Sequence, residues 1–130
     1  MTRVVLDASA LIGLLRGEAG HEVVAAAIES DGPAMSAVNL AEVASKLADE
    51  GADPERLRGL LLALDITVVA FDQRLALLSG ELRSRTRQLG LSLGDRACLS
   101  LAKDLGVPAL TSDRVWALLD LGIEIQLARP

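Results

Sequence analysis

The segment from Gly90 to Asp113 constrains the fold more than any other part of the sequence. It contains a nearly all-apolar stretch, Gly94 to Leu105, which predicts a buried helix. A Gly-Val-Pro break ends that helix, and a short apolar strand follows and ends at Thr111. Asp95 stands in the first helical turn and Asp113 just beyond the strand, at the ends of interior elements where an unpaired charge is costly. No Lys or His in the segment has a spacing that pairs with both, so a cation from outside is a candidate partner.

Helix and strand patterns alternate along the whole chain. We expect strands at 2–6, 34–36, 66–70 and 123–127, in addition to the one ending at Thr111. The strand at 123–127 is expected to be half-exposed at a sheet edge. We expect helices at 8–16, 21–30, 37–49, 54–64 and 114–121, and an arginine-bearing helix that begins after Asp72. This alternation predicts an α/β fold with a mainly parallel central sheet between helices, in a single domain spanning 1–130.

The composition predicts a globular protein with an aliphatic core. Its 130 residues are enough to bury a core without disulfides, and 51% are hydrophobic while 24% are charged. Aromatic residues make up only 2%, so Leu, Val, Ile and Ala must fill the interior. The start of the sequence lacks leader features, no apolar run reaches the length of a membrane span, and a lone Cys98 suits a reducing compartment. We therefore expect a cytoplasmic protein with no membrane association.

The charge distribution leaves two interpretations open. A formal net charge of −5 argues against simple electrostatic wrapping of nucleic acid. Four arginines nevertheless gather in the segment that leads to Asp95, namely Arg74, Arg83, Arg85 and Arg87. They form either a rim that binds phosphates beside an acidic centre or a solvated helix face.

Four acidic residues stand where an α/β protein binds ligands. Asp7 and Asp113 directly follow predicted strands, and ligands of parallel sheets gather beyond the carboxyl ends of the strands. Glu42 and Asp95 lie on helices that can lean over the same edge. Carboxylate oxygens suit hard cations such as Mg²⁺ and Mn²⁺, and the lack of Cys and His ligands argues against zinc. The sequence thus predicts a site of four carboxylates that binds a divalent metal.

Helix capping is the competing explanation for three of these acids. Asp7 and Asp113 each precede a predicted helix, and Ser92 with Asp95 has the spacing of a capping pair. Capping does not explain Glu42. His21 is read as a surface residue rather than a metal ligand, and Cys98 as a buried thiol rather than a nucleophile.

Four motifs in order along the chain resemble the PIN domain family, specifically the VapC-type toxins of bacterial toxin-antitoxin pairs. They are Val-Leu-Asp-Ala-Ser-Ala-Leu, Asn-Leu-Ala-Glu-Val, Leu-Ser-Leu-Gly-Asp-Arg-Ala-Cys-Leu-Ser-Leu-Ala and Leu-Thr-Ser-Asp-Arg-Val-Trp. The resemblance covers essentially the whole chain. It implies a PIN-like three-layer α/β/α sandwich and an endoribonuclease that depends on Mg²⁺ or Mn²⁺ and leaves a 5′-phosphate and a 3′-hydroxyl.

The resemblance also implies roles for particular residues. The acidic metal-binding and catalytic positions of the family match Asp7, Glu42, Asp95 and Asp113. Ser9 and Thr111 match hydroxyl positions near the metal, and Asn39 matches a polar position close to the site, although each also has an ordinary hydrogen-bonding or capping role.

Two arginines leave parts of this assignment open. Arg96 either pairs with a carboxylate or reaches a substrate phosphate. Arg114 follows Asp113 where some relatives place further acids, so the number of metal ions, one or two, stays open.

The resemblance further implies partners, and rival functions remain. VapC-type proteins form homodimers and are silenced by a VapB-type antitoxin that occupies the active-site groove.

The alternatives are a Mg-binding receiver-like signalling module, opposed by the absence of an acidic pair after the first strand, and a catalytically inactive PIN-like interaction domain. The RNA target and the antitoxin's identity do not follow from the sequence.

Overall fold

The computed structural model describes residues 3–30 and 32–129, and within them the chain forms one five-stranded sheet. All strand pairs are parallel, in the order β3-β2-β1-β4-β5. The strands are β1 (Val5–Leu6), β2 (Ala34–Ser36), β3 (Thr67–Val69), β4 (Ala109–Thr111) and β5 (Ile125–Leu127). The predicted α/β class and parallel sheet are confirmed, and β5 lies at a sheet edge as expected.

The three central strands are buried on both faces, which explains their continuous apolar sequences. Val5, Ala34 and Ala109 contribute to the core on one face of the sheet. Their neighbours along the strands contribute to the core on the other face, because successive side chains of a strand point to opposite sides; these are Leu6, Met35 and Leu110. The sheet therefore separates two hydrophobic cores.

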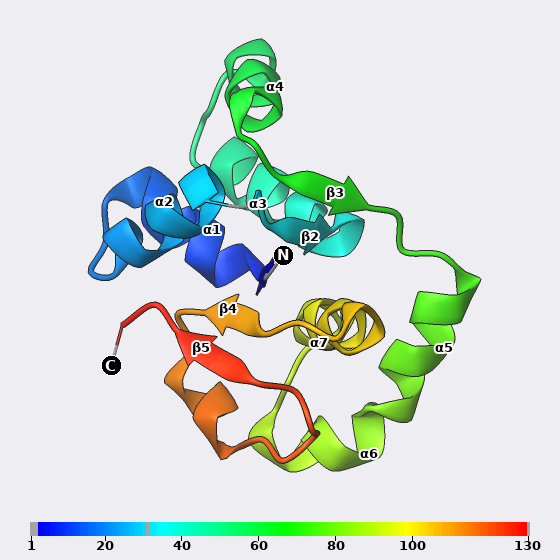
Figure 1. Ribbon diagram of the computed structural model, residues 1–130. Coiled ribbons are helices and arrows are strands. Elements are labelled where there is room, and N and C mark those ends of the chain that lie inside the picture. The colour runs from blue at the N-terminus through cyan, green and yellow to red at the C-terminus, as the bar shows by residue number, and fades with distance from the viewer. Residues whose placement is uncertain (1–2, 31, 130) are drawn as a thin grey trace.

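Helices cover both cores and make the three layers that the resemblance implied. The helices are α1 (Ala8–Arg16), α2 (His21–Ser30), α3 (Ala37–Asp49), α4 (Pro54–Ala63), α5 (Gln73–Glu81), α6 (Arg83–Thr86) and α7 (Leu93–Leu105). Residues of α1, α2 and α3 pack in one core, and residues of α5 and α7 pack in the other. Figure 1 shows α4 standing apart from α5, α6 and α7. Among the described helices, none has the length and apolar character needed to cross a membrane.

Helix α7 is the buried helix that the sequence predicted. Its residues from Ala97 to Ala102 are all buried between the sheet and α5. Ser92 and Asp95 form a capping box at its start, and Gly106 ends it with a φ of 68°, a left-handed conformation that glycine adopts without strain. Both ends of α7 are thus set by local sequence, which fixes the position of Asp95 relative to the sheet.

Several element boundaries differ from the predictions. The arginine-bearing helix is divided into α5, α6 and a 3-10 turn, η1 (Arg87–Leu89). The Thr86 hydroxyl donates to the Leu82 carbonyl, and Gly90 ends the turn with φ 69°. The helix expected at 114–121 is a 3-10 helix, η2 (Arg114–Leu118), and β5 begins only at Ile125. The strand expected from 2 to 6 is assigned at Val5–Leu6, and Thr2 lies outside the described residues.

Candidate functional site

The candidate site lies at the carboxyl ends of β1 and β4. These strands are parallel neighbours with Leu6 opposite Leu110, so the residues that follow, Asp7 and Thr111, emerge at the same edge. Asp7 is also the N-cap of α1, and its Oδ1 accepts from the backbone N–H of Ala10 at 2.9 Å. One carboxylate therefore ends a central strand and begins a helix.

Asp7 is held by a compact set of neutral donors. The hydroxyl of Thr111 donates to Asp7 Oδ2 at 2.6 Å, and the hydroxyl of Ser9 lies 2.8 and 2.9 Å from the two carboxylate oxygens. Ser9 also accepts from the backbone N–H of Ser112 at 3.1 Å. Both hydroxyl residues expected near the site thus contact its central acid and orient it.

Burial makes the charge of Asp7 costly in this arrangement. The residue is 3% exposed, and burial raises the pKa of its carboxyl to about 6 even though the hydrogen bonds from Thr111, Ala10 and Ser9 lower it. The negative charge of Asp95 raises the pKa slightly further. No Lys, Arg or His side chain donates a hydrogen bond to Asp7 in the described part of the chain. The carboxylate therefore lacks a cationic partner among residues 3–30 and 32–129.

Glu42 joins the site through a contact between α3 and α7. The amide nitrogen of Asn39 donates to Glu42 Oε1 at 2.9 Å and to the Gly94 carbonyl at 3.0 Å. The Glu42 carboxylate lies against Gly94 so closely that a Cβ at residue 94 would be 2.3 Å from Oε1. Asn39 is 1% exposed, and among the described residues its Oδ1 is a buried atom without a hydrogen-bond partner. Glu42 itself is exposed, so it is positioned by neighbours rather than by burial.

Asp95 and Asp113 both act as helix caps, as the competing explanation held. Asp95 Oδ2 accepts from the backbone N–H of Ser92 at 2.9 Å. Asp113 Oδ1 accepts from the backbone N–H of Val115 at 3.0 Å, and its own N–H donates to the Thr111 hydroxyl at 3.0 Å. Each cap uses one carboxylate oxygen. Capping and metal binding are therefore compatible at these positions.

Three of the four acids have charges that reach one core residue. Asp7, Asp95 and Glu42 all act on Cys98, whose thiol pKa is raised well above its ordinary value first by burial and then by these charges. Asp113 connects to the same site through Thr111. Within residues 3–30 and 32–129, no three Asp, Glu, His or Cys side chains converge into a ready-made metal-binding group. Cys98 is fully buried and protonated, in agreement with its interpretation as a core thiol.

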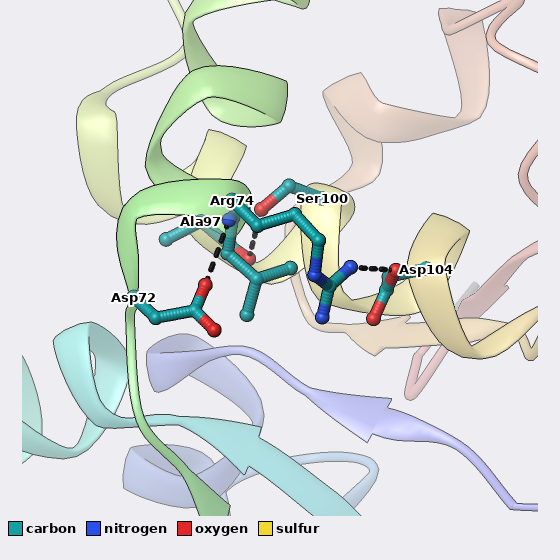
Figure 2. Close-up of polar contacts among 6 residues, drawn as sticks. Asp72, Arg74, Ala97, Ser100 and Asp104 are labelled. Atoms are coloured by element: carbon teal, nitrogen blue, oxygen red, sulfur yellow. Dashed lines mark hydrogen bonds and ion pairs between the residues drawn. The ribbon is translucent and has the colours of Figure 1, made fainter.

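Three of the arginines singled out in the sequence, Arg74, Arg85 and Arg96, make contacts within the protein. Arg74 forms an ion pair with Asp104, which links α5 to α7 (Figure 2), and Arg85 donates to the Asp120 carbonyl. Arg96 was expected to pair with a carboxylate or to reach a phosphate. Its Nη1 donates to the Ser79 carbonyl at 3.1 Å, a bond that also joins α7 to α5, and Arg96 forms no ion pair with a carboxylate in the described part of the chain.

A different set of basic residues lies beside Asp113, and only Arg114 among them was singled out in the sequence. A trough of about 690 Å³ includes Ser9 and Asp113 in its lining, and its basic side chains are Arg16, Lys46, Arg114 and Arg129. Helical spacing was the signal that could have found two of them. Arg16 lies two turns after Ser9 on α1, and Lys46 lies one turn after Glu42 on α3. We call this feature the cationic trough.

Comparison with known proteins places this arrangement in a family. The chain is similar in structure to a DNA-bound VapBC from Salmonella typhimurium (TM-score 0.75, 18% identity, covering 98% of this chain and 99% of that one). It is also similar to a toxin-antitoxin complex from Klebsiella pneumoniae (TM-score 0.70, 22% identity, 94% and 99% covered). A third similar structure is VapC20 of Mycobacterium tuberculosis, described as a sarcin-ricin loop cleaving toxin (TM-score 0.71, 17% identity, 93% and 98% covered).

At these identities, the solved structures establish the fold alone. The search of curated protein sequences found no match. The model of the PIN domain, however, matches residues 4–121, which is most of the sequence. This protein therefore belongs to the PIN domain family.

Proposed function

We propose that this protein is a metal-dependent endoribonuclease and the toxin component of a type II, VapBC-type toxin-antitoxin system. The observation that carries the proposal is Asp7, a buried carboxylate with no cationic partner among the described residues, at the carboxyl edge of the sheet in a PIN domain. Asp95 and Glu42 lie in the same region, although each adds negative charge. A bound divalent cation is the simplest compensation for such a set of acids.

The residues present fit a hard divalent cation. Asp7, Glu42, Asp95 and Asp113 offer only oxygen ligands, and the buried Asn39 Oδ1 is an additional acceptor that a hydrated ion could satisfy. We propose that these four acids hold Mg²⁺, for which Mn²⁺ can substitute. A divalent cation bound there would supply a water of lowered pKa and neutralise charge on the attacked phosphate.

The remaining residues of the site position the acids. Ser9 and Thr111 hold both oxygens of Asp7 in place, so the carboxylate is oriented before any ligand arrives. Asn39 ties Glu42 to the start of α7 and thus to Asp95. Preorganised ligands of this kind reduce the free energy spent on ordering the site when a substrate binds.

The proposed partners follow from the family and its solved members. Structures similar to this one include VapBC and toxin-antitoxin complexes, which supports a VapB-type antitoxin as the partner of this chain. VapC20 is described as cleaving the sarcin-ricin loop, which supports RNA as the substrate class. We further propose a homodimer that acts in the cytoplasm. Membership of the PIN family sets aside the receiver-like signalling module considered from the sequence.

Cleavage of RNA by the purified protein tests this proposal. The substrate is a pool of structured and single-stranded RNAs, incubated with Mg²⁺, Mn²⁺ or EDTA. Asp7→Asn should abolish cleavage because it removes the central charge. The matched control is Asp53→Asn, which makes the same change at the exposed N-cap of α4, where the side chain accepts from the Arg56 N–H at 3.1 Å.

Three results have distinct meanings. Metal-dependent cleavage that is lost in Asp7→Asn and retained in Asp53→Asn supports the nuclease. Cleavage that survives Asp7→Asn reveals a contaminating enzyme. Metal binding by calorimetry without cleavage of any RNA in the pool contradicts the endoribonuclease and leaves an inactive PIN-like domain.

A further inference from the structure

The cationic trough is a concentration of positive charge on an acidic protein. The chain carries a net charge of −5, yet four basic side chains line this one trough against two acidic ones, Glu18 and Asp113. Arg16 forms an ion pair with Glu50. Lys46, Arg114 and Arg129 form no ion pair within residues 3–30 and 32–129. The trough therefore offers cations whose charge is not neutralised by the described part of the protein.

The trough is built from the elements that carry the candidate site. Ser9, Ile12 and Arg16 follow one another at helical spacing, so one face of α1 runs from the Asp7 network into the trough. Arg114 follows directly on Asp113 after β4, and Arg129 follows the end of β5, the neighbouring parallel strand. The basic residues thus lie at the same carboxyl edge of the sheet as the acids and extend away from them.

The chemistry of the trough favours phosphates over bases. Proteins that bind single-stranded nucleic acid through bases stack them on aromatic side chains. The sequence holds one Trp, one Phe and no Tyr, and neither aromatic residue lines the trough. Trp116 is fully buried, and Phe71 packs against the core. Basic side chains without aromatic neighbours recognise the phosphate charge of a nucleic-acid strand.

We propose that the cationic trough binds the phosphodiester backbone of single-stranded RNA on the Asp113 side of the acids, through Lys46, Arg114 and Arg129 and without stacking of bases. This inference rests on the proposed function, since it supplies the path of the substrate strand. It also assigns strand binding to residues from separate parts of the sequence rather than to the Arg83 to Arg87 segment.

Binding of a fluorescently labelled single-stranded RNA, followed by anisotropy in EDTA over a range of salt concentrations, tests the inference without catalysis. The test variant is Arg114→Gln with Arg129→Gln. The matched control is Arg83→Gln with Arg87→Gln, which removes the same charge from exposed arginines outside the trough. We expect the test variant to raise Kd by about tenfold and to reduce the slope of log Kd against log salt by about 1.4, or roughly 0.7 for each phosphate that the protein no longer neutralises.

The outcomes separate this inference from the proposed function. The proposal for the trough is contradicted if the test and control variants weaken RNA binding equally, or if neither variant weakens it. If the wild type cleaves RNA and the test variant binds and cleaves as well as the wild type, the nuclease stands and the trough fails. Trough-dependent RNA binding without cleavage by any metal-loaded form supports the trough and contradicts the nuclease. Binding of an acidic peptide in place of RNA would also overturn the inference.

Discussion

Asp7 is a buried carboxylate, and within the described part of the chain its hydrogen bonds come only from hydroxyls and a backbone N–H. These donors stabilise the charged form, but burial outweighs them, so the pKa of Asp7 rises to about 6. In the metal-free protein the charged side chain therefore destabilises the fold. The site is arranged for a ligand at a cost in stability.

The pH dependence of stability reveals this cost. Because the folded pKa lies above the ordinary value of 3.8, the contribution of Asp7 to stability is fully present below about pH 4 and is lost as the pH rises through about 6. Each tenfold change in proton affinity is worth about 1.4 kcal/mol, so the total loss is roughly 3 kcal/mol. Asp7→Asn removes this titration.

Denaturant unfolding in EDTA measures the effect. Relative to the wild type, Asp7→Asn should gain roughly 3 kcal/mol of unfolding free energy between about pH 4 and pH 7.5. Asp53→Asn serves as the control, because its cap is exposed. A difference between Asp7→Asn and the wild type that does not change with pH would contradict the raised pKa.

Gly94 is the residue that makes room for Glu42. Its φ is not positive, so the backbone does not require glycine, but a Cβ would lie 2.3 to 2.5 Å from the Glu42 carboxylate. The carboxylate is the exposed end of a flexible side chain and can swing away. We therefore expect Gly94→Ala to leave the unfolding free energy within about 1 kcal/mol of the wild type. We expect it also to lower Mn²⁺ affinity at least about tenfold by displacing one ligand.

The measurements for Gly94→Ala are thermal unfolding and calorimetric titration with Mn²⁺. The control is Gly80→Ala, which adds the same methyl group to α5, where nothing lies within 4 Å. If both variants bind Mn²⁺ as the wild type does, Glu42 is not a ligand or does not depend on the space at Gly94.

At the scale of elements, α7 connects the acids to the core. It is buried along one whole face, and its first turn carries Asp95 while its carbonyl at Gly94 anchors Asn39. Ser92→Ala removes the hydroxyl that accepts from the Asp95 N–H at 3.1 Å. Loss of an N-cap costs about 0.5 to 2 kcal/mol.

Chemical denaturation should therefore show Ser92→Ala to be destabilised by about 1 kcal/mol. The exposed Ser84 of α6 provides the control, since Ser84→Ala removes a hydroxyl without a described hydrogen bond. Equal stability of the two variants would show that the capping box contributes nothing to the fold.

Most elements could be predicted from sequence because their signals are local. Asp53 followed by Pro54, Ser92 with Asp95, and Gly106 are local signals of a helix end, and each stands at a helix end in the structure. The break between α5 and α6 could not be predicted, because the pattern of inward leucines continues through it. It depends on where Thr86 bonds and on how the segment wraps α7.

Three of the four acids, Asp7, Asp95 and Asp113, could be located from sequence because each follows a strand or begins a helix, whereas Glu42 lies within α3. Their contacts could not be predicted, since Asn39 to Gly94 and Asp7 to Thr111 join residues far apart in the chain. The basic residues of the trough could not be grouped from sequence for the same reason, because they come from four separate segments. Of the arginines that cluster in sequence, Arg74 and Arg85 make contacts within the protein.

At the scale of the whole molecule, the proposed metal binding would be linked to folding. A cation that binds only the folded protein stabilises it by about 2.7 kcal/mol at a concentration one hundred times its Kd. Adding Mn²⁺ to the EDTA-treated wild type should therefore raise its Tm by several degrees, since about 1 kcal/mol shifts the Tm of a domain of this size by roughly 4 °C. Asp7→Asn should show a much smaller rise. Identical rises in the two proteins would indicate that Mn²⁺ binds elsewhere.

Three of the four acids carry two roles, since Asp7, Asp95 and Asp113 each cap a helix as well as facing the site. Asparagine caps helices as well as aspartate does. The genetic code converts an aspartate codon to an asparagine codon by one base change. A mutation of this kind at Asp7 or Asp113, which are N-cap residues, would keep the helix end while removing the charge. A single mutation can therefore give a folded protein that has lost a charge of the proposed site. If a lineage retains these aspartates, their retention would indicate selection for activity rather than for folding.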